Sequence, residues 1–286
     1  MDICINGQPA DITLDSERTM GELLSGMEDW LRSSGYRLKG LEIDGESITG
    51  NAVPEVFNRD LQGIHSVNIK VCPQTELILD ALQDARECLE AYTAAPPNEK
   101  RRIQEDWQTS AASSFLRAEN PELFKLINGG LTGRTQETGL AYGPETGALT
   151  VVDERIRELK DPREEYARME SLVGGITGRL EELPLDIQTG KDKRAAETVS
   201  LFSGITEKIF RLFVLLQSKM EGIDALVIDS IPVYTFLEEF CAALKELLAA
   251  YESKDVVLVG DLAEYELAPR LRTFYAAIKA SVVSLV

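Results

Sequence analysis

The chain has very few residues of the kinds that build catalytic and metal sites. Its 286 residues include one histidine, His65, and four scattered cysteines, Cys4, Cys72, Cys88 and Cys241, with no CxxC pair. A Ser-His-Asp or Cys-His arrangement would have to use that histidine. A di-iron carboxylate site needs a Glu-x-x-His from each of two helices, and Cys/His zinc sites need clustered ligands. We therefore predict reduced thiols and neither a catalytic set, a metal nor a cofactor.

Long apolar runs and an excess of positive charge are also missing. No stretch approaches the ~18 apolar residues of a membrane span, and Met1–Cys4 lacks the basic and apolar segments of a secretory signal. Lys and Arg number 30 against 48 Asp and Glu, for a net charge of −18. Nucleic acids and anionic membranes bind through excess Lys and Arg. We expect a cytoplasmic protein that binds neither, with an acidic surface that is simply solvated or meets a basic partner.

A phosphate-binding loop is not evident, although one glycine-rich hexapeptide occurs almost twice. Gly129–Arg134 reads GGLTGR and Gly174–Arg179 reads GGITGR. Neither copy has the spacing or the lysine of a Walker A loop. The second copy falls within a helical apolar stripe, where glycine favours close helix packing. The first copy opens a glycine-rich stretch and is the more open to a ligand or a partner.

The first 72 residues have strand and turn signals that the rest of the chain lacks. Asn6-Gly7 is a strong two-residue hairpin signal, and Thr19 with Glu22 forms a capping box that starts a helix ending before Gly35. The predicted strands cover residues 2–5, 11–14, 38–43 with a continuation at 46–48 after Asp44-Gly45, and 66–71.

This order of hairpin, helix, strand pair and closing strand resembles the ubiquitin-like β-grasp fold over about a quarter of the chain. The resemblance rests on element order and turn chemistry. Ubiquitin-like modifiers and sulfur carriers end in a free Gly-Gly, whereas this strand continues as Lys70-Val71-Cys72-Pro73. The resemblance therefore implies a small docking domain and no carrier chemistry.

Residues 73–286 show helical periodicity almost throughout. The most apolar helix, Ala195–Met220, repeats Phe202, Ile209, Leu212 and Leu216 on one side and is apolar on most others, so we expect it at the centre of a bundle. The other predicted helical stretches lie at 78–92, 103–115, from Asn120-Pro121 to Gly129, after Asp153, 166–183 ending at Pro184, 230–252, 256–267 and 271–285. The 166–183 stripe also suits pairing between two chains, so self-association is an open alternative.

Residues 129–150 break the helical pattern with a glycine-rich loop or hairpin. Leu140–Tyr142 and Leu149–Val151 are candidates for its two strands. Long connections inside helical domains tend to be functional or disordered. We therefore take Arg134 and Tyr142 as candidates for contact with a ligand or a partner.

Acidic residues surround one tyrosine near the C-terminus. Asp261 and Glu264 are three apart, which places them on one helical face beside Tyr265. Cation binding or acid–base chemistry at this pair is one interpretation, and solvated helix charge is the commoner one. The interpretation that concerns function is contact between Tyr265, its acidic neighbours and a basic partner.

Two segments, DIQTGKDKRAAETVSLFSGITEKIFRLF and KDVVLVGDLAEYELAPRL, resemble helical bacterial proteins of unassigned function. This resemblance implies a bacterial source and no activity.

The sequence predicts an α+β protein with a β-grasp domain at 1–72 and a helical domain at 73–286. The leading functional hypothesis is a non-enzymatic adaptor, scaffold or chaperone-like protein that binds a protein partner through helical grooves or the sheet edge. The alternative is a small-molecule-binding or enzymatic protein with its site under the 129–150 loop.

Overall fold

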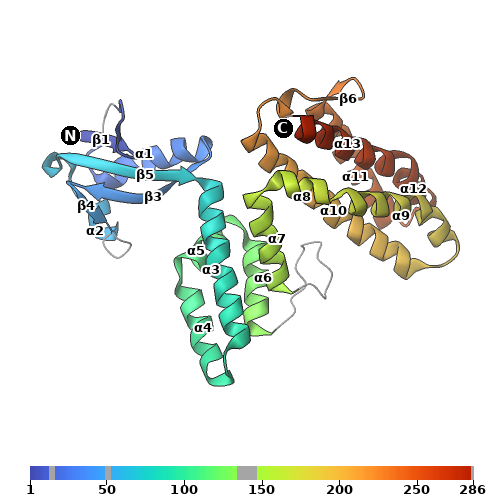
Figure 1. Ribbon diagram of the computed structural model, residues 1–286, viewed down its shortest axis with the longest axis horizontal. Coiled ribbons are helices and arrows are strands. Elements are labelled where there is room, and N and C mark those ends of the chain that lie inside the picture. The colour runs from blue at the N-terminus through green and yellow to red at the C-terminus, as the bar shows by residue number, and fades with distance from the viewer. Residues whose placement is uncertain (13–16, 49–52, 134–146, 285–286) are drawn as a thin grey trace. The chain divides into compact units, whose positions relative to one another are not determined.

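The computed structural model describes residues 1–12, 17–48, 53–133 and 147–284. The chain divides into two compact units, Met1–Asp84 and Ala85–Val286 (Figure 1). The first unit is a mixed five-stranded sheet with a helix, and the second is largely helical. The predicted α+β class is confirmed.

The sheet has the strand order β2-β1-β5-β3-β4. The first strand, β1 (Asp2–Ile5), runs parallel to β5 (Ser66–Pro73), and β3 (Tyr36–Ile43) runs antiparallel to β5. The edges are short, since β2 is Gln8–Pro9 and β4 is Glu46–Ile48. Helix α1 (Met20–Ser33) packs on the sheet next to β3, and its buried Leu23, Leu24 and Met27 share one apolar core with Val67 and Ile69 of β5. Two short helical segments, α2 (Val53–Phe57) and a 3-10 turn at Leu61–Gly63, precede β5.

Local turn chemistry accounts for most of this unit. Asn6 and Gly7 have φ of 49° and 77°, as a type I′ turn requires, and the capping box of Thr19 and Glu22 is present at the start of α1. The second strand begins earlier than predicted, because Gln8 pairs directly with Ile5 across the tight turn and β2 is Gln8–Pro9. Of the predicted strand at 11–14, Asp11 and Ile12 are not in a strand, and residues 13 and 14 lie outside the described residues.

The helical unit begins within α3 (Gln74–Ala94) and extends to α13 (Ala268–Ser284). Between them lie α4 (Pro97–Thr109), α5 (Ala111–Glu119), α6 (Pro121–Thr132), α7 (Ala148–Lys160), α8 (Pro162–Arg168), α9 (Glu170–Gln188), α10 (Asp192–Lys219), α11 (Val233–Glu252) and α12 (Val256–Asp261). A 3-10 turn (Ile223–Ala225) and the small hairpin of β6 (Val227–Ile228) and β7 (Ile231–Pro232) separate α10 from α11. A π-helix, Leu262–Leu267, joins α12 to α13.

Helix α10 is buried in the apolar core formed by residues 166–282, as its apolar sequence predicted. It contacts α7, α8, α9 and α13, and its Phe202, Ile209, Leu212 and Leu216 are buried (Figure 1). Aromatic side chains of α10, α11 and α13 meet there in stacked and edge-to-face pairs. The bundle core is therefore built on this helix.

Several predicted helix ends were wrong because tertiary contacts decide them. Ser110 splits the predicted helix at 103–115, since its hydroxyl caps α5 by accepting from the Ser113 N–H. Pro184 lies inside α9 and does not end it. Its ring lies close to Gly260, where an added Cβ would come within 3.1 Å of the Pro184 Cβ and Cγ. The absent proline N–H costs α9 one backbone hydrogen bond, which this packing offsets.

The 129–150 break is shorter than predicted. Helix α6 continues through Gly129 and Gly130 to Thr132 and ends at Gly133, whose φ is 65°. Helix α7 begins at Ala148, so Leu149–Val151 is helical and not a strand. Residues 134–146, including the predicted strand at 140–142, lie outside the described residues.

The two copies of the glycine-rich hexapeptide have different surroundings, which gives a paired prediction. A Cβ added at Gly130 would lie 2.7 Å from Ala148 Cβ and 3.0 Å from Leu89 Cδ2, whereas one added at Gly175 would meet nothing within 4 Å. We expect Gly130→Ala to destabilise the protein by about 1–3 kcal/mol through overpacking. Gly175→Ala should stabilise it by about 0.5–1 kcal/mol, because alanine favours helix. Chemical denaturation of both variants measures this, and equal effects would contradict it.

Candidate functional site

Three of the five predicted site residues lie together on one exposed surface. Asp261 ends α12, and Glu264 and Tyr265 follow in the π-helix. Tyr265 is 66% exposed. Its hydrogen bond to the Glu264 carboxylate raises the pKa of Tyr265, and the charges of Glu264 and Asp261 act in the same direction. Single π-turns occur frequently at functional sites, so this acidic–aromatic surface is a candidate for contact with a partner.

The other two candidates, Arg134 and Tyr142, lie outside the described residues. The hypothesis of a ligand site under the 129–150 loop stays a prediction.

An apolar groove lies where the end of α9, the start of α10, the end of α11 and α12 meet. In the sequence, its α12 residues directly precede the acidic–aromatic surface of Asp261, Glu264 and Tyr265. We name this apolar groove the α9–α12 groove. Its volume is about 350 Å³. It is lined by Leu183, Ile187, Asp192, Ala195, Ala196, Val199, Tyr251, Lys254, Val256 and Val259. Its rim exposes large apolar groups, since Tyr251 and Val256 are each 53% exposed and the neighbouring Val257 is 69% exposed.

Ion pairs between the end of α9 and the start of α10 hold two walls of the groove together. The buried Asp186 of α9 accepts hydrogen bonds from Lys191 Nζ and Arg194 Nη1, both at 3.2 Å, on its Oδ1. Arg194 also pairs with Glu182. These contacts link the end of α9 to the start of α10, the two elements that form one side of the groove.

A second charged cluster joins α7 and α8 to α10. Its centre is Glu158, which is 1% exposed and accepts from Arg211 Nε at 2.8 Å, Arg211 Nη2 at 3.0 Å and Arg155 Nη1 at 3.2 Å. Lys208 pairs with Glu154, and lies 3.6 Å from Glu165. Burial raises the pKa of Glu158 to about 7, although the charges of Arg155 and Lys208 lower it. Such buried ion pairs fix geometry more than they stabilise.

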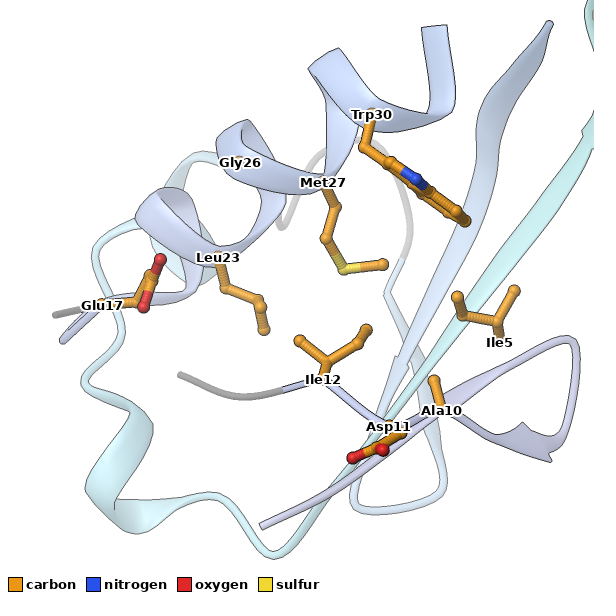
Figure 2. Close-up of a pocket in the computed structure, with 9 residues that line it drawn as sticks. All are labelled: Ile5, Ala10, Asp11, Ile12, Glu17, Leu23, Gly26, Met27 and Trp30. Atoms are coloured by element: carbon orange, nitrogen blue, oxygen red, sulfur yellow. The ribbon is translucent and has the colours of Figure 1, made fainter. Parts of the chain in front are cut away.

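The sheet unit has a hollow of its own between α1 and the start of the chain (Figure 2). Ile5, Ile12, Leu23 and Met27 supply its apolar lining, with Trp30 at one end. Asp11 and Glu17 are its charged members, and Ile12 and Glu17 border residues 13–16, which lie outside the described part of the chain. We treat this hollow as an apolar face of the sheet unit and assign no ligand to it.

The described part of the chain has no recognisable metal-binding cluster or membrane-spanning helix. No group of three or more His, Cys, Asp and Glu side chains there is arranged to hold a metal ion. None of the helices described is both long and apolar enough to cross a bilayer.

The α9–α12 groove was missed by reasoning from the sequence. Its walls come from the consecutive helices α9 and α10 and from the end of α11 with α12, and these two pairs are far apart in the chain, so no local pattern brings them together. One available signal was the run Val256–Val259, four consecutive apolar residues in a six-residue helix. Four consecutive residues point to different sides of a helix, so a helix at the surface cannot bury all of them. Val256 and Val257 are the ones left exposed.

Similar proteins carry no assigned function. Residues 1–73 match the family model described as the TP0873 N-terminal domain, and residues 164–277 match a domain of unknown function, DUF8042. An uncharacterized protein of Treponema pallidum (strain Nichols) is 35% identical over 97 residues, which make up 34% of this chain and 48% of that protein. The match thus spans about half of that relative's length. No solved structure matches the chain. The expectation of bacterial relatives is therefore confirmed, and the function has to be argued from the groove.

Proposed function

We propose that the chain is a non-enzymatic, cytoplasmic protein-interaction module that binds an amphipathic helix of a partner protein in the α9–α12 groove. The observation that carries this proposal is the exposed apolar rim of the groove. Tyr251, Val256 and Val257 are more than half exposed around a lining of leucine, isoleucine, alanine and valine. Exposed apolar groups gathered around a concave surface mark binding sites.

The groove suits a helix better than a strand. An amphipathic helix places apolar side chains three and four residues apart, and two of them fit a hollow of about 350 Å³. The sheet edges are less suited to strand addition, because β2 has two residues and β4 has three. The sheet unit, with its β-grasp-like order of elements, then serves as a second docking domain.

Two further features support an adaptor over an enzyme. The single histidine, His65, is almost fully exposed, and its nearest carboxylate, Asp44, is 3.9 Å away. That carboxylate accepts the backbone N–H groups of His65 and Ser66 and so has a structural role. The four cysteines are free thiols, which agrees with a reducing cytoplasm.

Filling the groove tests the proposal. Ala196 lines the groove yet is exposed, so Ala196→Trp should occupy the hollow without disturbing the core. The probes are two dye-labelled helical peptides with leucine on one face and either lysine or glutamate on the other. We expect at least one of the two peptides to bind the wild type. Ala196→Trp should weaken the binding of that peptide by about ten-fold or more, because a well-filled apolar contact is lost. Fluorescence anisotropy measures both.

The matched control is Val214→Trp, at another exposed position of α10 that does not line the groove. It should leave peptide binding unchanged, and both variants should melt like the wild type. Binding of neither peptide, or equal binding by Ala196→Trp and the wild type, would exclude the groove as the binding surface.

A further inference from the structure

The charges around the α9–α12 groove are not balanced. Asp192 lines the groove, and Asp255 and Asp261 stand at the two ends of its α12 wall. All three side chains are exposed, and none has a cation partner among the described residues. Asp255 accepts the Leu258 N–H at 3.1 Å as the cap of α12 and keeps its other oxygen free for a partner.

The neighbouring cations are mostly engaged within the chain. Lys191 and Arg194 pair with Asp186, Arg194 also pairs with Glu182, and Lys193 lies 3.9 Å from Glu197. Lys254 is the one cation that lines the groove. Asp192 and Lys254 line the groove itself, and the exposed Asp255 and Asp261 at the two ends of α12 add two carboxylates beside it.

The exposed face continues into the acidic–aromatic surface. Val257 and Asp261 are four residues apart in α12, so they share its outer face, and Tyr265 with its hydrogen-bonded Glu264 follows. A tyrosine ring beside carboxylates offers a cation both ion pairing and a favourable contact with the ring face. Apolar and anionic groups therefore alternate from the groove outward.

From this distribution we propose that the occupant of the groove is a basic amphipathic helix, with Lys or Arg bordering its apolar face. This inference rests on the proposed function and adds the chemistry of the partner. Leucine-like side chains enter the groove, flanking cations meet Asp192 and Asp255 beside it, and cations farther along the helix meet Asp261 on the outer face of α12. The net charge of −18 draws such a helix to the chain, and the carboxylates around the groove decide where it docks.

The experiment compares the two peptides and two sets of substitutions in the full chain. Asp192→Asn, Asp255→Asn and Asp261→Asn together remove the three carboxylates, and asparagine still caps α12 at position 255. A control with the same change in net charge replaces three exposed glutamates that do not line the groove, Glu87, Glu221 and Glu238, by glutamine. Anisotropy is measured at low and physiological salt.

We expect the leucine–lysine peptide to bind the wild type about ten-fold more tightly than the leucine–glutamate peptide, the size expected for several partly exposed ion pairs. The asparagine triple variant should lose about ten-fold of that affinity, and the control triple variant should lose less than about two-fold. Added salt should weaken the binding of the leucine–lysine peptide to the wild type and should change its binding to the asparagine triple variant little.

Two results would overturn the inference. One is equal binding of both peptides, each still blocked by Ala196→Trp, which would leave the groove as a docking site without charge preference. The other is an equal loss in the two triple variants, which would reduce the preference to attraction by the net charge. Peptide binding that Ala196→Trp does not affect would instead contradict the proposed function itself.

Discussion

Replacement of Leu212 by aspartate is expected to unfold the helical unit and to leave the sheet unit folded. Leu212 is fully buried in the bundle core, where α10 meets its neighbouring helices. The change removes a buried leucine, which costs about 2–5 kcal/mol, and buries a charge without a partner, which costs several kcal/mol more. The total approaches the whole free energy of unfolding of a typical domain, which is about 5–15 kcal/mol.

The measurement is thermal unfolding by circular dichroism, combined with NMR of the full chain. The helical signal should be lost at ambient temperature, while the dispersed resonances of the sheet core, such as Val67 and Ile69, persist. Val214→Asp, two residues away in the same helix at a position 61% exposed, is the control and should melt like the wild type. A Leu212→Asp variant that melts normally would mean that α10 is not central to the unit.

Glu158 should make the helical unit less stable as the pH rises from about 4.5 to about 7. Burial favours the protonated form of Glu158 and raises its pKa to about 7, although the charges of Arg155 and Lys208 favour the ionised carboxylate. Below the unfolded pKa both states are protonated and Glu158 contributes no pH dependence. Between the unfolded pKa of 4.5 and the folded pKa of about 7, only the folded state keeps the proton on Glu158. The free energy of unfolding therefore falls as the pH rises through this range. The loss is complete above the folded pKa and amounts to about 3 kcal/mol, at 1.36 kcal/mol per pKa unit.

Glu158→Gln tests this, because glutamine has the shape of the protonated acid. Urea unfolding at pH 5 and pH 8 gives a stability difference for each protein, and we expect this difference to change by about 3 kcal/mol in the variant. Glu207→Gln is the control, since Glu207 pairs with the same arginines but is largely exposed. If both variants keep the pH dependence of the wild type, Glu158 is ionised throughout this range.

Sequence reasoning succeeded where neighbouring residues decide the structure. The Asn6-Gly7 turn, the capping box at Thr19 and the Asn120-Pro121 helix start depend on contacts within a few residues, and all three are present. The apolar period of α10 likewise predicted its burial, because a helix with so little polar surface has to be enclosed.

Sequence reasoning failed where contacts between residues far apart in the chain decide the structure. Pro184 is a helix breaker by its chemistry, yet α9 continues because Gly260, 76 positions along the chain, leaves room for its ring. The groove depends on which apolar residues of α9, α10 and α12 stay uncovered, and periodicity cannot distinguish a covered apolar face from an open one. Asp261, Glu264 and Tyr265 could be placed on one surface from the sequence because they lie within five residues of one another, and their role stays a prediction.

The most direct test of the account is to observe which side chains respond when a basic amphipathic helix binds. Methyl NMR of the full chain during titration with the leucine–lysine peptide reports on both units at once. The account predicts the largest shifts at the groove methyls of Leu183, Ile187, Val199, Val256 and Val259. Shifts centred on Ile5, Ile12 and Met27 of the sheet hollow, with the groove methyls unmoved, would contradict it.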